Sequence, residues 1–551
     1  MKTDIEISQE ANLEDIDQIC EKIGLEDYEK LGKYKAKIDL SYLQKDKKDS
    51  KLVLVTATNP TPSGEGKTTV NIGLSMALNK VGKNAISVLR EPSLGPSFGR
   101  KGGATGGGYS QVLPMDEINL HFTGDFHAIT SSVNLVAAII DNHIYQGNEK
   151  NIDPKQIVWR RCVDLNDRAL RNVVIGMGNK TDGVIREDKF DITVATEMMA
   201  VLCLATSLDD FKRRVGKMIV AYDIYNNPVT VDDIKATGSV AVLMKDALKP
   251  NLVQTIENTP AIIHGGPFAN IAHGCNSLIA TKTALAISDY VVTEAGFGAD
   301  LGAEKFNDIK CRLGDIKPDA TVIVTSIRSL KYQAGMPSDA LQEENLDYLN
   351  KGFENLKIHI ENMKKFGTNI VVAINKFDTD TDEEISQLKS LTKSMEVNAI
   401  ETTVFANGSQ GGIDLANEVV DLCEKDNGFE FLYDVNLTIK EKLEKISKDI
   451  YRAKDVVYTK KANKDIKRIE DLGYDNLPIC VAKTPYSFSD DPNIRITDKD
   501  YDITIREARI NAGAGFIVAY TSNILTMPGL PKTPNAYEID IDSNNKIVGL
   551  S

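Results

Sequence analysis

The chain of 551 residues carries 79 acidic and 65 basic side chains, which gives a formal net charge of −14 at neutral pH. This charge opposes general binding to nucleic-acid phosphates or anionic membranes, so any anion site must be built locally. Hydrophobic residues make up 42% of the chain, and its length allows two or three domains with cores of their own. We therefore expect a globular protein with no nucleic-acid and no membrane partner.

Cysteine usage and the first residues bear on the compartment. The seven cysteines are widely spaced and include no C-x-x-C pair, which is typical of reduced core residues. The N-terminus shows no basic stretch followed by an apolar one, and no apolar run is long enough to cross a bilayer. The sequence thus predicts a cytoplasmic location.

In chain order, an apolar pattern over 16–23 predicts a helix, and the run 52–55 predicts the first buried strand. That strand leads into Thr61-Pro62-Ser63-Gly64-Glu65-Gly66-Lys67-Thr68-Thr69, which opens a helical pattern. In such a strand, turn and helix, backbone N–H groups and the helix dipole face an anion. Lys67 can then reach the outer phosphates, and Thr68 can ligate Mg²⁺. We expect this segment to bind a nucleoside triphosphate.

Two alternatives accompany this motif. Only its second half matches G-x-x-x-x-G-K-[ST], because Thr61 stands where the first glycine is expected, so an ordinary polar turn is one alternative. A dinucleotide site is the other, and it is disfavoured because Thr69 stands where its third glycine would be.

The rest of the chain alternates strand and helix patterns. Further strands are predicted at 85–89, 157–160, 218–222, 261–264, 290–293, 321–325 and 369–375. This order favours an α/β fold with a P-loop NTPase-like, doubly wound, mostly parallel sheet and additional smaller α/β domains. We expect a P-loop domain over 1–360, a second α/β domain over 361–526 and a small C-terminal unit over 527–551, which begins at the helix-breaking run 527–534.

Arg90 directly follows the second strand predicted for this sheet. Residues at the carboxyl ends of strands line the ligand crevice of an open α/β sheet, so Arg90 should emerge beside the phosphate-binding segment. Its guanidinium fork would hold a carboxylate and a phosphoryl group. The alternative is a structural ion pair with Glu91 or another carboxylate.

Two glycine-rich segments also follow strands. The glycines between 102 and 108 form either a mobile surface loop or a close backbone approach to a substrate. The acidic residues of 293–305 would hold Mg²⁺ through water or orient a nucleophile, and its glycines would admit a phosphorylated intermediate. The alternative for 293–305 is a tight turn with a helix cap.

The tetrapeptide Asn375-Lys376-Phe377-Asp378 ends a predicted strand and matches the Asn-Lys-x-Asp signature of guanine-binding GTPases. A regulatory GTPase is nevertheless disfavoured. The tetrapeptide lies much farther from the phosphate-binding segment than in a compact GTPase, and no switch-like D-x-x-G occurs between them.

Taken together, these motifs closely resemble the formate–tetrahydrofolate ligase family over nearly the entire chain. The resemblance rests on TPSGEGKTT at 61–69, REPSLGP at 90–96, the 100–108 loop, FTGDFH at 122–127, EAGFGADLGAEK at 294–305 and TMPGLPK at 526–532. It implies that formate attacks the γ-phosphate of MgATP to give formyl phosphate and ADP. The N10 amine of tetrahydrofolate then attacks the formyl carbon and expels phosphate, giving 10-formyltetrahydrofolate for one-carbon metabolism.

The resemblance also assigns roles in the reaction. It implies that Lys67 and the surrounding amides bind the ATP phosphates, that Thr68 lies on the Mg²⁺ side, and that Arg90 clamps formate and formyl phosphate. These cations neutralise the charge that builds during phosphoryl transfer. The resemblance further implies that Gly296 and Phe297 line the pocket of the formyl phosphate intermediate.

Three further assignments follow from the resemblance. The carboxylate of Asp125 is expected to assist deprotonation of the attacking amine. Acidic residues around Glu91 would host an activating monovalent cation, K⁺ or NH₄⁺. The family is typically homotetrameric, and we expect the same assembly here.

For the folate pocket, the resemblance implies that Phe377 and Phe405 sandwich the pterin ring. In the family the second position is typically tryptophan, whereas the one tryptophan of this chain is Trp159. A phenyl ring still stacks but loses area and the indole N–H, so folate affinity or the preference for a polyglutamate tail should differ. The turn 375–378 then presents Phe377 to folate, and guanine specificity is not needed.

Two alternatives of other classes remain at this point. One is a P-loop switch or partitioning ATPase that responds to a macromolecular partner and ignores formate. The other is a catalytically inactive folate-binding or scaffold protein, which the intact Lys67, Thr68 and Arg90 oppose.

Overall fold

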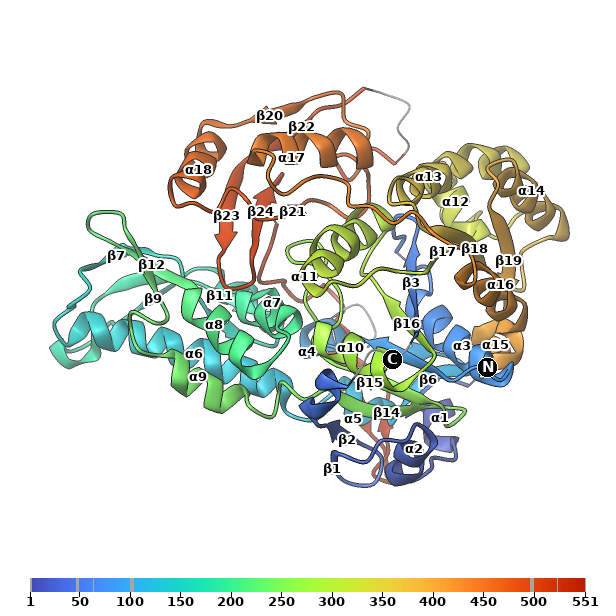
Figure 1. Ribbon diagram of the computed structural model, residues 1–551, viewed down its shortest axis with the longest axis horizontal. Helices are drawn as coiled ribbons and strands as arrows, with labels where there is room; N and C mark the ends of the chain where they lie inside the picture. The colour runs from blue at the N-terminus through green and yellow to red at the C-terminus, as the bar shows by residue number, and fades with distance from the viewer. Residues whose placement is uncertain are drawn as a thin grey trace.

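The computed structural model describes residues 2–45, 49–62, 64–99, 104–495, 500–522 and 524–550. At its centre is a 12-stranded sheet with the order β1-β2-β14-β15-β4-β16-β3-β17-β18-β19, to which β6 and β5 add beside β14 (Figure 1). Its strands are β1 Tyr28–Lys30, β2 Ala36–Ile38, β3 Lys51–Ala57, β4 Ala85–Leu89, β5 Gly106–Gly107, β6 Ser110–Leu113, β14 Asn251–Thr255, β15 Pro260–Ile263, β16 Tyr290–Glu294, β17 Ala320–Thr325, β18 Asn369–Asn375 and β19 Asn398–Thr402.

The seven strands from β15 to β19 along this order pair in parallel, whereas β1, β2, β5, β6 and β14 form antiparallel pairs. The prediction of an α/β protein with a mostly parallel sheet is thus confirmed. Because β18 and β19 extend this same sheet, the segment that opens the expected 361–526 domain continues the sheet of the first one. The domain limits themselves stay a prediction.

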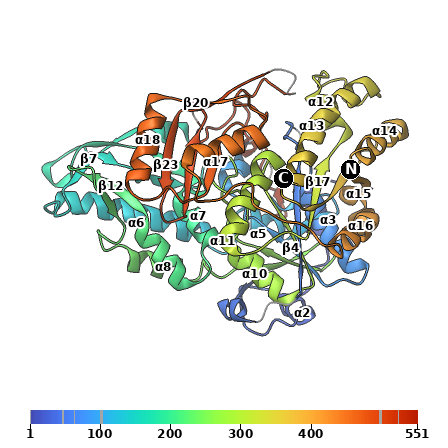
Figure 2. The ribbon, with the colours of Figure 1, turned by 45° about the horizontal axis from the view of Figure 1, so that its top comes forward.

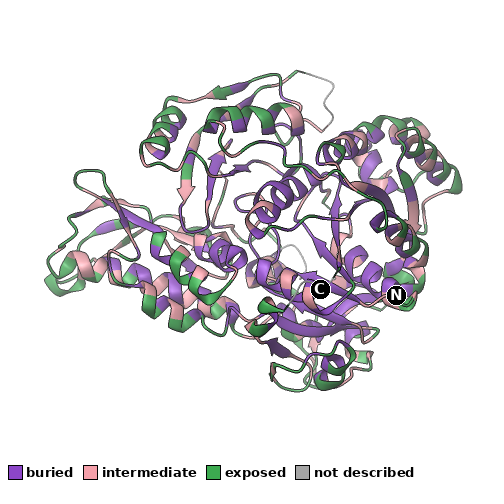
Figure 3. Cartoon of the chain, viewed as in Figure 1, coloured by how far each residue is buried: buried purple, intermediate pink, exposed green. Residues whose placement is uncertain are grey.

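Helices cover both faces of the parallel strands. Alternate residues of β3 face opposite ways, so Val53 and Val55 pack with α3 (Lys67–Lys80) and α16 (Ile413–Cys423), while Leu52 and Leu54 join the core beneath α10 (Leu278–Ile287) and α13 (Leu346–Lys365). Burial on both faces explains why these strands read as continuous apolar runs (Figure 3).

Two lobes stand beside the sheet (Figures 1 and 2). The first, called the α6–α9 lobe, contains α6 Asp125–Tyr145, β7 Ile152–Ile157, β8 Arg161–Val163, β9 Val173–Ile175, β10 Arg186–Asp188, β11 Phe190–Ile192, α7 Glu197–Leu204, α8 Leu208–Lys217, β12 Ile219–Asp223, β13 Pro228–Thr230 and α9 Thr237–Met244. The second, called the α17–β24 lobe, contains α17 Ile439–Lys445, β20 Val456–Tyr458, α18 Lys460–Asp471, β21 Ile479–Ala482, β22 Ile503–Ile505, β23 Glu507–Asn511 and β24 Phe516–Tyr520.

Two strand predictions differ from the structure in this part of the chain. The predicted strand 157–160 is not formed, because Ile157 ends β7 and residues 158–160 connect it to β8. The predicted strand 218–222 is present as β12, but it joins a small antiparallel sheet with β7 and β13 instead of the central sheet. Local apolar patterns locate strands, whereas the choice of sheet depends on partners distant in sequence.

Shorter elements complete the fold: α1 Asp4–Glu10, α2 Ile16–Lys22, α4 Leu94–Phe98, α5 Met115–Asn119, α11 Arg312–Gly314, α12 Ile327–Gln333, α14 Asp382–Lys393, α15 Val404–Asn407, β25 Asp540–Ile541 and β26 Ile547–Val548. The helix predicted over 16–23 is α2. Near the C-terminus, the carbonyl of Ile547 accepts a hydrogen bond from Gln9 of α1. Among the described residues, no helix is both long and apolar enough to span a membrane.

Candidate active site

The strand, turn and helix predicted around the segment 61–69, which is expected to bind phosphate, are confirmed, since β3 ends at Ala57 and α3 begins at Lys67. Gly66, at the N-cap of α3, has a φ of 78°, and a Cβ there would come within 2.5 Å of Asn375 Nδ2. That Asn375 amide donates a hydrogen bond to the carbonyl of Glu65 at 3.3 Å. Glycine is therefore required at 66 for two reasons, the left-handed backbone and the close approach to the end of β18. Ser63 lies outside the described residues.

A single buried carboxylate connects this segment to Arg90. Thr68 Oγ1 donates to Glu294 Oε2 at 2.8 Å, and Arg90 Nη2 donates to Glu294 Oε1 at 3.3 Å. Glu294 is 1% exposed and ends β16, which lies between β3 and β4 in the sheet. Arg90 thus emerges at the same sheet edge as the phosphate-binding segment, as predicted, and its carboxylate partner is Glu294 rather than Glu91.

The Arg90 guanidinium is only partly engaged. Its Nε is buried and has no hydrogen-bond partner in the described part of the chain. A Cβ on Gly296 would come within 2.8 Å of Arg90 Nη1 and 2.9 Å of Ala269 Cβ, so the guanidinium lies directly against that glycine. The next residue, Phe297, has a φ of 60°, which is strained for an aromatic side chain and is a feature often found at functional sites.

The loop after β15, residues 264–277, is a wall of this site that the sequence reading missed. Its Gly265 carbonyl accepts from Glu91 N at 2.8 Å, and its Gly274 carbonyl accepts from Gly296 N at 3.0 Å, so the loop lies between the Arg90 segment and Gly296. The signal was available, because a glycine-rich loop directly follows a predicted strand of the parallel sheet.

His273 is the most unusual side chain of that loop. It is fully buried, and neither ring nitrogen has a hydrogen-bond partner among the described residues. Burial lowers the pKa of His273 to about 3, and the charges of Lys310, Lys305 and Arg90 act in the same direction. A neutral imidazole with two unsatisfied nitrogens beside Arg90 is suited to a hydrogen bond with a polar ligand or water.

Asp125 and Glu91 lie deeper in the structure. Asp125 is 1% exposed, its Oδ1 lies 2.7 Å from Lys37 Nζ, and its Oδ2 accepts from Asn251 Nδ2 at 2.8 Å. Burial, then the negative charge of Asp125, raises the pKa of Glu91 well above its usual range, and Lys37 opposes this shift. These contacts give Asp125 a structural ion pair, and its role as proton acceptor for the amine stays a prediction.

Replacing Asp125 by alanine should destabilise the protein by about 3–5 kcal/mol, because the change leaves the Lys37 ammonium buried without its partner. The measurement is the free energy of unfolding in urea. The double variant Asp125→Ala/Lys37→Met should recover much of the loss, since it removes both charges. Unchanged stability combined with lost turnover would instead favour the catalytic role of Asp125.

Phe377 and Phe405 occupy neighbouring positions at the same sheet edge. They follow the ends of β18 and β19, where Asn375 pairs with Thr402 in parallel register. Both rings are accessible, at 36% and 41% exposure. The guanidinium of Arg328 stacks 4.3 Å from the centre of the Phe377 ring. Two exposed aromatic rings at adjacent strand ends are suited to stacking on a flat ligand.

Part of the glycine-rich segment supports Phe405. A Cβ on Gly108 would come within 2.1 Å of the Phe405 carbonyl oxygen, and one on Gly107 would come within 3.1 Å of its ring. The Phe405 carbonyl also accepts a hydrogen bond from Tyr109 N at 2.7 Å. These glycines therefore allow a close backbone approach to a protein group. Residues 100–103 lie outside the described part of the chain.

A comparison with protein families gives an independent finding. The family described as formate–tetrahydrofolate ligase has a model that matches residues 2–551. The match includes all the elements of the site, from the phosphate-binding segment to the two exposed phenylalanines.

Proposed function

Because this chain belongs to the formate–tetrahydrofolate ligase family, we propose that the sheet edge formed by the ends of β3, β4 and β16 is where it activates formate. The protein is an ATP-dependent ligase of one-carbon metabolism that joins formate to tetrahydrofolate. This function replaces the GTPase, the switch ATPase and the inactive scaffold as interpretations of the motifs. The observation that carries the location is the Glu294 bridge between Thr68 and Arg90.

The nucleotide phosphates would lie at the N-terminus of α3, in a P-loop NTPase-like arrangement supported by the conformation of Gly66 and by helices on both faces of the sheet. Backbone N–H groups of residues 64–69 would face them, and Lys67 would add a point charge. Thr68 and Glu294 together present oxygen donors, the ligand type that Mg²⁺ prefers, so this pair fits the ion. Bound Mg²⁺ would supply charge neutralisation at the phosphate oxygens.

Formate would bind to the open side of the Arg90 guanidinium, next to Gly296 and Phe297. One of its oxygens attacks the γ-phosphorus, the bond to the β,γ-bridging oxygen breaks, and ADP leaves. The mixed anhydride so formed carries a good leaving group, whereas free formate repels nucleophiles through its charge. The amine of tetrahydrofolate attacks the formyl carbon, phosphate leaves and the amine loses a proton. The buried loop 264–277 would keep water from the intermediate.

Glu91 remains our candidate for a monovalent cation such as K⁺ or NH₄⁺. Its Oε2 is buried without a hydrogen-bond partner in the described chain, so the oxygen fits a cation that lacks strict geometry. Lys37, which forms an ion pair with Asp125, already supplies one positive charge nearby. We also propose a homotetramer in the cytoplasm. The cytoplasmic location is supported by seven buried cysteines that form no disulfide.

The test of this function is ADP release from MgATP with formate and tetrahydrofolate added singly and together, with detection of formylated folate and K⁺ present. Turnover that needs both co-substrates and yields matching amounts of product is expected. ATP hydrolysis that ignores both would contradict the proposed site chemistry.

Phe377→Ala should raise the KM for tetrahydrofolate about tenfold and leave the KM for ATP unchanged, because loss of one stacking partner costs about 1–2 kcal/mol. Phe405→Trp should lower the same KM, since indole offers more area. Steady-state kinetics with tetrahydrofolate of one and of three glutamates measure both effects. Phe431→Ala, at a comparably exposed phenylalanine (40%) on another part of the chain, is the control. Equal effects at Phe377 and Phe431 would argue against a folate contact.

A further inference from the structure

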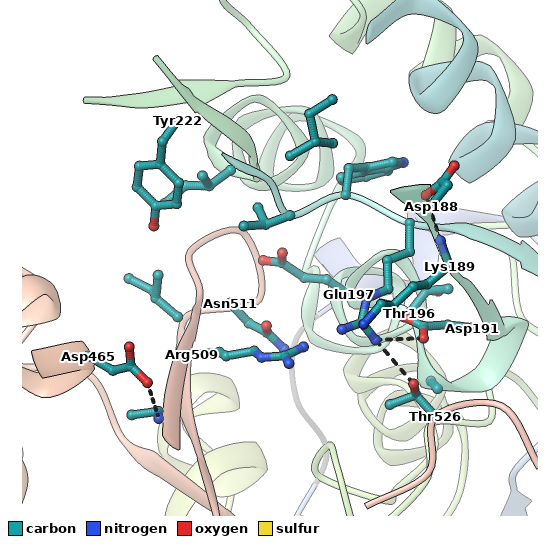
Figure 4. Close-up of a pocket in the computed structure, with 18 of the residues that line it drawn as sticks. Asp188, Lys189, Asp191, Thr196, Glu197, Tyr222, Asp465, Arg509, Asn511 and Thr526 are labelled. Atoms are coloured by element: carbon teal, nitrogen blue, oxygen red, sulfur yellow. Dashed lines mark hydrogen bonds and ion pairs between the residues drawn. The ribbon is translucent and has the colours of Figure 1, made fainter. Parts of the chain in front are cut away.

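Two adjoining cavities lie between the α6–α9 lobe and the α17–β24 lobe, with volumes of about 870 and 530 Å³. They share six lining residues, Arg160, Lys189, Lys461, Arg509, Tyr520 and Thr526. Figure 4 shows the larger one, with Lys189 and Asp191 on one side and Asp465, Arg509 and Asn511 on the other. Of the sequence motifs, the one at 526–532 reaches this space through Thr526 and Met527, and the reaction described above does not use it.

The smaller cavity is strongly positive in a protein whose net charge is −14. Six of its fifteen lining residues are cationic and one, Glu507, is anionic; the cations are Arg160, Arg171, Lys189, Lys461, Arg506 and Arg509. Glu507 forms ion pairs with two of these cations, with Lys461 at 2.5 Å and with Arg509 at 2.8 Å. Concentrating like charges around one space costs free energy in the empty protein, and an anionic ligand would relieve that cost.

Half of these cations have no carboxylate partner. In the described ranges, Arg171, Lys189 and Arg506 form no ion pair, whereas Arg160 pairs with Asp191 at 3.0 Å. Arg171 Nε donates a hydrogen bond to the Met527 carbonyl at 2.9 Å. Arg506 Nε donates one to the Thr521 carbonyl, also at 2.9 Å. These bonds fix the guanidinium planes and leave the terminal nitrogens for a ligand. Pre-oriented guanidinium groups favour bidentate recognition of carboxylate or phosphate.

The larger cavity adds a second, independent observation. Arg468 lines it, stacks 3.3 Å above the Tyr222 ring and has a buried Nη2 with no hydrogen-bond partner in the described chain. The carboxylates of Asp191 and Asp465 on its walls are already engaged by Arg160 and Lys461. The positive charge of the space formed by the two cavities is therefore concentrated in the smaller cavity, which adjoins the larger one.

We propose that this interlobe space binds a small polyanion that carries several carboxylate or phosphate groups. The cations come from both lobes, so the ligand would bridge them and hold them together. Two sources share this chemistry, a γ-linked oligoglutamate and a polyphosphate. The inference is separate from the formate site, because the cavity residues lie outside the Glu294, Arg90 and Thr68 cluster.

Calorimetric titration of the full chain with tri-γ-glutamate and with inorganic triphosphate, at constant ionic strength, tests the proposal. At least one probe should bind saturably, and the probe that binds identifies the source. The double variant Lys189→Gln/Arg506→Gln should weaken that binding about tenfold or more. The control Lys212→Gln/Lys217→Gln removes the same charge from exposed positions of α8 and should leave binding unchanged.

A second pair of variants avoids any loss of cations. Leu525 lines the smaller cavity and is 55% exposed, so both Leu525→Glu and Leu525→Gln should fold normally. The added negative charge of Leu525→Glu should repel the ligand, whereas the neutral Leu525→Gln should still bind it. Equal affinities for these two variants, or heats no larger than those of sodium chloride, would overturn the proposal. Ligase turnover measured on the same samples separates this outcome from a failure of the formate site.

Discussion

Arg90→Lys is expected to lower formate-dependent turnover about 10³-fold while ATP binding stays within a few-fold of the parent protein. The substitution keeps a positive charge beside Glu294, which is 1% exposed, so the buried carboxylate retains a partner. What is lost is the planar fork. An ammonium cannot hold formate and a transferring phosphoryl group at once in fixed geometry, so the loss should fall on the chemical step.

Two measurements separate this effect from a structural one. Turnover is followed by ADP release with both co-substrates, and ATP affinity is followed by equilibrium binding of nucleotide. Arg452→Lys is the matched control. Arg452 Nη2 lies 2.8 Å from Glu361 Oε2 in a partly buried ion pair, and this pair is not part of the proposed site. Unchanged turnover in Arg90→Lys and Arg90→Ala would remove Arg90 from the mechanism.

Lys67→Met should lower turnover by a similar factor, about 10³-fold, and should also raise the KM for ATP. Methionine preserves the length and helix propensity of the side chain but removes the charge at the first residue of α3, where the phosphates would lie. Lys67 also opposes the rise in the pKa of Glu65 that burial causes, so the variant should favour the protonated form of Glu65.

The control for this prediction lies on the same helix. Lys80→Met removes one charge from the last turn of α3, at the opposite end of the helix from Lys67, and should leave kinetics unchanged apart from a small loss of helix stabilisation. The assay is initial-rate kinetics over a range of MgATP at saturating formate and tetrahydrofolate. Similar KM values for ATP in the two variants would place the nucleotide elsewhere.

The local pattern of apolar residues in the sequence was sufficient to predict many strands of the fold. The strands β4 and β18 have the predicted limits 85–89 and 369–375, and β3, β15, β16 and β17 differ by a few residues at most. These strands are buried on both faces, so their apolar runs are continuous and easy to recognise. The run 157–160 lacked that burial pattern, and there the structure has an irregular connection between β7 and β8.

The sequence by itself determined the strand, turn and helix around residues 61–69, the place of Arg90 at a strand end and the family, because each depends on residues close together in the chain. Only the tertiary structure decided that Glu294 joins Thr68 to Arg90, that Lys37 pairs with Asp125, and that His273 lies unsatisfied beside the Arg90 segment. The physical reason is the order of the parallel sheet. It brings β3, β4 and β16 side by side across more than two hundred residues of sequence, and no local period encodes which strands become neighbours.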